Sequence, residues 1–153
     1  MLAAYGIKDR RVWVADSFTG LAPPNPQEFP ADAGSQLHEI PLLSISLEDV
    51  KRNFSKYGML DEQVVFLRGW FKDTLPAAPI EQLAILRLDG DLYESTIQAL
   101  NTLYRKVSRG GFIIVDDYAL VGCRKAIDDF RIQHEIADAI ENIDGTAVYW
   151  RKN

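Results

Sequence analysis

Apolar residues occur in short runs that end at polar or glycine residues, and these runs predict five or six β-strands. Two of the runs, LAILRLDG and FIIVDD, are apolar on both faces up to their polar ends, which is typical of buried parallel strands. Near the C-terminus, Asp144 and Gly145 lie between β-forming residues and predict a hairpin. The predicted strands cover residues 11–18, 64–69, 83–90 and 112–117, and the hairpin covers 140–152.

Apolar residues at helical spacing lie between the predicted strands. They predict helices at 46–58, 96–107 and 122–136, and a single helical turn within 71–82. The proline-rich segment 19–36 predicts a surface loop, which either covers a site or is an ordinary insertion.

Polar residues and glycines mark the expected helix ends. Ser46 with Asp49 resembles a capping box for the first helix. Ser95 or Thr96 is expected to cap the helix at 96–107, and the pair Gly110-Gly111 is expected to end that element.

Strands and helices alternate along the chain, and the last element is an antiparallel hairpin. This order predicts an α/β doubly wound fold, and 153 residues predict a single domain over 1–153. The net charge of −5 argues against binding nucleic acid or an anionic membrane surface. A single cysteine and the lack of a long apolar run favour the reducing cytoplasm.

Carboxylates follow the predicted strands. Asp16, Gly69, Asp89 and Asp116 each come at a strand end, where open parallel sheets bind their ligands. Two carboxylates ~4 Å apart repel each other by about 4 kcal/mol at an effective dielectric constant of 20. If Asp89, Asp116 and Asp117 converge, either one retains a proton or a cation lies among them. Oxygen ligands favour Mg²⁺, Mn²⁺ or Ca²⁺.

Six motifs occur in a fixed order along almost the whole chain: VADSFTGL, GWFKDTLP, LRLDGDLYEST, VDDY, GCRKAIDDFR and AVYWRK. The ordered series resembles the macrocin O-methyltransferase family, which uses S-adenosylmethionine and a metal ion to methylate sugar hydroxyls during antibiotic biosynthesis. The resemblance implies a Rossmann-like class I methyltransferase fold and a small-molecule glycoside as substrate.

The resemblance also implies roles for individual residues. Asp16 would bind the cofactor's ribose hydroxyls, and the segment after the second strand would frame its adenine. Asp89 would be the general base, with Asp91 as the alternative. The metal, Mg²⁺ or Mn²⁺, would be held by Asp89, Asp116 and Asp117. The implied cofactor-binding residues are Asp16, Ser17, Gly69, Trp70, Phe71, Lys72 and Asp89.

The resemblance begins late in the family pattern. Family members carry a strand and a glycine-rich turn before the segment that matches MLAAYG, so we expect an N-terminally truncated sheet without its central strand. Three interpretations follow: a fragment with a gap in its sheet, a homo-oligomer that pairs strands across subunits, or direct pairing of 11–17 with 84–89.

Two other functions remain open. Asp89-Gly90-Asp91 also matches the DxD pattern of metal-dependent glycosyltransferases, a short and weak signal. Alternatively, the truncated chain is a catalytically inert α/β domain that self-associates.

Overall fold

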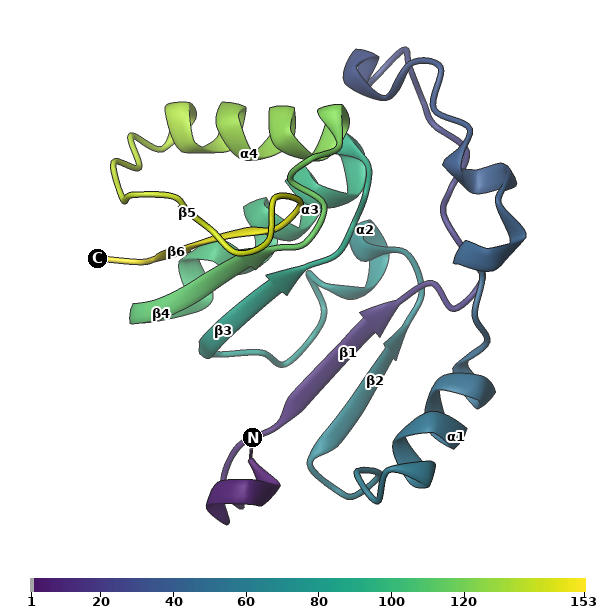
Figure 1. Cartoon of the computed structure of the whole chain (residues 1–153), viewed down its shortest axis with the longest axis vertical. Coiled ribbons are helices and arrows are strands. Elements are labelled where there is room, and N and C mark those ends of the chain that lie inside the picture. Colours follow the sequence, from purple (N-terminus) through teal and green to yellow (C-terminus); the bar gives the residue numbers. More distant parts are fainter. Residues whose placement is uncertain (1) are drawn as a thin grey trace. The chain divides into compact units, whose positions relative to one another are not determined.

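The computed structural model describes residues 2–153, and its elements are shown in Figure 1. The chain forms two compact units. The first unit contains residues 2–23 and 36–74, and the second contains residues 24–35 and 75–153.

The first unit is built on two parallel strands. β1 (Val12–Asp16) pairs with β2 (Val64–Arg68) in uninterrupted register. α1 (Leu47–Lys56) precedes β2, and the short α2 (Phe71–Thr74) follows it. Phe66 of β2 makes edge-to-face contacts with Phe18 and Phe54, so aromatic packing fixes α1 against this sheet. Three-residue 3₁₀ turns lie at Ala3–Tyr5, Leu37–Glu39 and Pro41–Leu43.

The second unit holds a four-stranded sheet in the order β3-β4-β6-β5. β3 and β4 are parallel, whereas β6 is antiparallel to both β4 and β5, and the predicted hairpin is confirmed. α3 and α4 pack against each other beside this sheet (Figure 1). The bounds are β3 Leu83–Leu88, α3 Tyr93–Leu103, β4 Val107–Val115, α4 Val121–Gln133, β5 Glu141–Asn142 and β6 Val148–Arg151, with 3₁₀ turns at Pro30–Asp32 and Tyr104–Lys106.

The core of the second unit lies between its sheet and the two helices. Leu100 of α3, Ile127 of α4 and Trp150 of β6 are completely buried, together with Ile113 and Val115 of β4. These apolar contacts hold β3 and β4 side by side, and that pairing positions the candidate site.

The predicted cap of α3 is wrong. The helix begins at Tyr93 rather than near Thr96, because the carboxylate of Asp32 accepts hydrogen bonds from the backbone N–H groups of Tyr93 and Glu94 at 2.7 and 3.0 Å. Ser95 instead donates its hydroxyl to the carbonyl of Gly90. Asp32 belongs to the predicted loop, so part of that loop packs on α3.

One expectation about the strands is also wrong. Gly110 and Gly111 lie inside β4, next to a register shift between Leu83 and Ile85 of β3, and do not end the preceding helix. Among residues 2–153, β1 pairs with β2 within the first unit and β3 pairs with β4 within the second. Direct pairing of 11–17 with 84–89, considered from the sequence, stays a prediction. Within the same residues, no helix combines the length and the apolar character needed to cross a bilayer.

Candidate active site

The register of β3 and β4 places two carboxylates side by side. Leu88 pairs with Val115 at the carboxyl ends of the two strands, and the backbone N–H of Asp116 donates to the carbonyl of Leu88 at 2.9 Å. Asp89 and Asp116 are the next residues of each strand. Parallel pairing of two apolar runs that end together therefore brings these carboxylates to one edge of the sheet.

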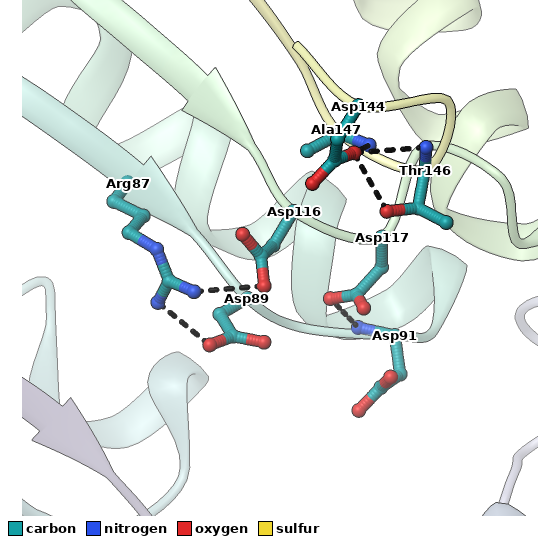
Figure 2. Close-up of polar contacts among 8 residues, drawn as sticks. All are labelled: Arg87, Asp89, Asp91, Asp116, Asp117, Asp144, Thr146 and Ala147. Carbon is teal, nitrogen blue, oxygen red and sulfur yellow. Dashed lines mark hydrogen bonds and ion pairs between the residues drawn. The ribbon is translucent and has the colours of Figure 1, made fainter.

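Asp117 completes a cluster of three carboxylates, shown in Figure 2. One oxygen from each of Asp89, Asp116 and Asp117 lies within 4.8 Å of the others. Asp89 is exposed at the rim, whereas Asp116 and Asp117 are half-buried. The structure thus brings together the three residues that the resemblance implies as metal ligands.

Arg87 spans this cluster from β3. Its Nη1 atom lies 2.7 Å from Oδ2 of Asp89, and its Nη2 atom lies 2.8 Å from Oδ2 of Asp116 (Figure 2). Burial opposes the charged guanidinium, but the hydrogen bonds and charges of the two carboxylates outweigh it and raise the pKa of Arg87. The guanidinium therefore neutralises part of the negative charge of the cluster.

Asp91 lies in a tight turn between β3 and α3. Its φ of 54° falls in the left-handed region, which is uncommon for a residue other than glycine. Its backbone N–H points at Oδ2 of Asp117 over 3.4 Å, so the turn is tied to the cluster. A strained backbone held in place by its surroundings is a frequent feature of functional sites.

The environment disfavours ionisation of two of these carboxyl groups. Burial first, and then the charges of Asp91 and Asp89, raise the pKa of Asp117 to about 6. Burial, followed by the charges of Asp89 and Asp116, also raises the pKa of Asp91. Like-charge repulsion on this scale is what a bound cation would relieve.

The hairpin loop supports the segment that carries Asp117. The carboxylate of Asp144 accepts hydrogen bonds from the backbone N–H groups of Thr146 and Ala147, which fixes the loop (Figure 2). The carbonyl of Thr146 then accepts a hydrogen bond from the N–H of Ala119 at 3.1 Å. The turn that follows β4 is thereby anchored to the C-terminal hairpin.

The expected ribose-binding residues lie in the first unit. Asp16 ends β1, and Oδ1 of its carboxylate accepts the backbone N–H of Phe18 at 2.5 Å, in a turn where Phe18 has a φ of 57°. Ser17 donates its hydroxyl to the carbonyl of Gly20 at 2.6 Å. Because Asp16 pairs with Arg68, the N–H of Gly69 reaches the carbonyl of Asp16 at 2.9 Å.

The expected adenine-framing residues follow β2. Gly69 has a φ of 139°, and a Cβ added there would lie 2.8 Å from Cγ2 of Thr74, so a glycine is required. The ring of Trp70 is partly exposed, whereas Phe71 is half-buried and Lys72 is exposed. The structure therefore brings Asp16, Gly69 and Trp70 to one edge of the two-stranded sheet.

Comparison with known proteins identifies the family of the chain. The family model for macrocin O-methyltransferases matches residues 1–152. The chain belongs to the macrocin O-methyltransferase family. This assignment removes the support for the glycosyltransferase alternative, since a three-residue DxD pattern occurs here within a longer methyltransferase motif.

Relatives in this family methylate sugars on natural products. The chain is 53% identical over 152 residues to the 8-demethyl-8-(2,3-dimethoxy-alpha-L-rhamnosyl)-tetracenomycin-C 4'-O-methyltransferase of Streptomyces olivaceus, covering 99% of this chain and 58% of that protein. It is 50% identical over 156 residues to the mycinamicin III 3''-O-methyltransferase of Micromonospora griseorubida, covering 100% of this chain and 61% of that protein.

A solved structure shows the same fold. The structure of the O-methyltransferase NovP superposes with a TM-score of 0.96 at 51% identity, covering 99% of this chain and 64% of that chain. The Rossmann-like methyltransferase fold expected from the sequence is confirmed. The chain spans about three fifths of the length of these macrocin O-methyltransferase relatives.

Two residues near the site were missed by the sequence analysis. Arg87 could have been found, because a charged residue two positions before Asp89 in a predicted strand shares its face of the sheet. Asp32 carried no such signal, since it lies 61 residues from the helix that it caps. It was one of several polar residues in a proline-rich loop.

Proposed function

We propose that this chain carries the catalytic core of an S-adenosylmethionine-dependent, divalent-metal-dependent methyltransferase that acts on a sugar hydroxyl. The observation that carries the proposal is the convergence of Asp89, Asp116 and Asp117 in a chain of this family. Neither feature would suffice alone, because acidic clusters are common on protein surfaces and a family contains members with altered sites.

The three carboxylates fit a hard divalent cation. They supply oxygen donors within 4.8 Å of one another, and a positively charged side chain already lies against two of them. Mg²⁺ and Mn²⁺ prefer such ligands, and soft nitrogen or sulfur donors are not needed. Bound there, the cation would stabilise negative charge that develops on the acceptor oxygen.

The end of the two-stranded sheet fits a nucleoside. In this proposal Asp16, supported by the Ser17 turn, accepts hydrogen bonds from the two ribose hydroxyls. Trp70 offers a partly exposed ring on which adenine could stack, with Gly69, Phe71 and Lys72 around it. S-adenosylmethionine supplies a methyl group on a positively charged sulfur, and Asp89 is proposed as a further cofactor contact.

The remaining task of the protein is to remove the hydroxyl proton. A carboxylate of this chain would accept the hydroxyl proton, while bound S-adenosylmethionine would supply the methyl group and leave as S-adenosylhomocysteine. Asp89 is one candidate base, because it is the exposed member of the carboxylate cluster. Asp91 is the other, because its raised pKa makes it a stronger base than an ordinary aspartate.

The acceptor is proposed to be a glycoside of a small natural product. The two relatives described above act, by their names, on a rhamnosyl-tetracenomycin and on mycinamicin III. Both relatives align with nearly the whole chain at about half identity, which supports a deoxysugar hydroxyl as the acceptor class.

We further propose that the chain forms a homo-oligomer. Among residues 2–153, β1 pairs only with β2 inside the first unit and β3 pairs only with β4 inside the second, and strand edges left unpaired within a unit favour association. Light scattering at micromolar concentrations should give a mass above that of one 17.3 kDa chain. A monomer mass over that concentration range would contradict this part of the proposal.

The function is tested by methyl transfer from radiolabelled S-adenosylmethionine to a panel of glycosides that includes the rhamnosyl-tetracenomycin and the mycinamicin III named for the two relatives. We expect transfer that requires Mg²⁺ or Mn²⁺ and is abolished by EDTA. Asp89→Asn and Asp91→Asn should separate the two candidate bases, since loss of a general base typically lowers the rate by about 10²–10⁴-fold.

Binding provides the decisive control for this assay. Calorimetry with S-adenosylhomocysteine reports cofactor binding whether or not the right acceptor is in the panel. Heat from cofactor binding that disappears in Asp16→Asn would support the proposal. The absence of heat at millimolar cofactor, with and without Mg²⁺, would instead favour an inert domain.

A further inference from the structure

Arg87 is a charged residue in the otherwise apolar strand β3, and the geometry of the sheet places it beside the carboxylate cluster. Side chains at i and i+2 of a strand share a face, so Arg87 lies on the same face as Asp89. Arg87 also pairs in register with Ile114, two residues before Asp116 on the neighbouring strand. One guanidinium can therefore reach both carboxylates, and its two nitrogens do so at 2.7 and 2.8 Å.

The charge balance around the cluster is strongly negative without a metal. Asp89, Asp91, Asp116 and Asp117 contribute up to four negative charges, and Arg87 is the positive side chain that contacts them among the described residues. Without Arg87, Asp89 and Asp116 would repel each other with no positive side chain in contact with either of them.

We infer that Arg87 is a built-in counter-ion that holds Asp89 and Asp116 together in the metal-free chain and competes with a divalent cation for them. The inference rests on the proposed metal site and adds to it a fixed limit on how tightly the site binds its metal. Oδ2 of each carboxylate is already occupied by the guanidinium, and a dication bound to the same groups would be repelled by it.

The surroundings of Arg87 allow it to yield to a metal. Its side chain is 51% exposed, so the guanidinium can turn into solvent while its aliphatic stem stays on the sheet. An arginine keeps its charge at every pH that a cell experiences. The competition is therefore constant, and metal binding depends on the concentration of the cation. The cluster is expected to bind its metal more weakly than three free carboxylates would.

The variant Arg87→Gln tests this inference, with Lys125→Gln as the matched control. Lys125 is similarly exposed, belongs to the same unit and pairs with Asp129 one turn along α4, so its loss changes the net charge equally. Two quantities are measured on the full chain: the Kd for Mn²⁺ by calorimetry, and the melting temperature in EDTA.

We expect Arg87→Gln to bind Mn²⁺ roughly tenfold or more tightly than the wild type, because a nearby like charge has been removed. In EDTA the same variant should melt at a lower temperature, because its carboxylates repel each other. Lys125→Gln should leave the Kd within about twofold. Arg87→Lys keeps the charge but loses the two-pronged contact, so its Kd should lie between those of the wild type and Arg87→Gln.

The possible results separate this inference from the metal site itself. If the wild type binds Mn²⁺ and Arg87→Gln binds equally or more weakly, Arg87 merely orients the ligands and the competition is refuted. If neither protein binds Mn²⁺, the metal site fails and the inference fails with it. If Arg87→Gln binds Mn²⁺ and the wild type does not, the result would support competition strong enough to prevent metal binding.

Discussion

At the scale of single residues, the site is defined by crowded negative charge. Asp117 shows this most clearly, because burial and the charges of Asp91 and Asp89 raise its pKa to about 6. A carboxyl group in the unfolded chain titrates near its ordinary pKa of 3.8. The folded chain therefore binds a proton at Asp117 more tightly than the unfolded chain does.

The first prediction concerns the pH dependence of stability in EDTA. Since the pKa of Asp117 is raised on folding, its contribution to stability is greatest below pH 3.8 and is lost as the pH rises to about 6. Asp117→Asn removes this loss. The melting temperature of the variant relative to the wild type should therefore increase between pH 4 and pH 7.

Melting curves of the two proteins in the same buffers measure this difference directly. Comparing them at each pH cancels the titration of other groups, several of which act in the opposite direction. A difference in melting temperature that stays constant over this range would contradict the crowded environment assigned to Asp117.

At the scale of secondary-structure elements, remote contacts decide where helices and strands begin. α3 begins where the buried carboxylate of Asp32 meets its first N–H groups. β4 begins earlier than its apolar run, because Gly110 and Gly111 permit a bulge against β3. In both cases a residue outside the hydrophobic pattern sets the boundary.

The second prediction concerns Asp32. Asp32→Ala should lower the free energy of unfolding by about 2 kcal/mol, since it removes a helix cap and leaves two backbone donors without their partner. Urea unfolding followed by circular dichroism measures the loss. Glu28→Ala, an exposed change in the same loop, is the control and should cost less than about 0.5 kcal/mol. Equal losses in the two variants would show that the cap does not hold α3.

The third prediction concerns the close approach of β3 and β4. A Cβ at Gly111 would lie 2.8 Å from the carbonyl oxygen of Ala84. Gly111→Ala should therefore cost about 2–3 kcal/mol through overpacking. Gly145→Ala, which meets no atom within 4 Å but has a positive φ, should cost about 1 kcal/mol. The order of the two losses in urea unfolding tests the packing, and a reversed order would contradict it.

Short runs of apolar residues predicted the strands, because strand formation depends on neighbouring residues. Two apolar runs that end at Asp89 and Asp116 were enough to predict two parallel strands, and their carboxylates do meet. The expected burial of both faces is wrong for β3, because Ala84, Ile85 and Arg87 are exposed. Asp32 could not be predicted as the cap of α3, because a sequence does not show which loop folds back on which helix. Gly110-Gly111 was misinterpreted because glycine both ends helices and permits bulges.

At the scale of the whole molecule, the chain has the motifs and fold of its family over about three fifths of the length of its relatives. The carboxylate cluster lies entirely within the second unit, and the expected ribose-binding residues lie within the first. Metal binding can therefore be tested separately from cofactor binding, and each result assigns a function to one unit.

The central claim is that Asp89, Asp116 and Asp117 together bind one divalent cation. Electron paramagnetic resonance of free Mn²⁺ measures this most directly, because the signal of the free ion falls as the ion binds. We predict uptake of one Mn²⁺ per wild-type chain, displaced by excess Mg²⁺, and no uptake by the double variant Asp116→Asn, Asp117→Asn. The account would be contradicted if the double variant took up as much Mn²⁺ as the wild type. It would also be contradicted if the wild type and Arg87→Gln both took up no Mn²⁺.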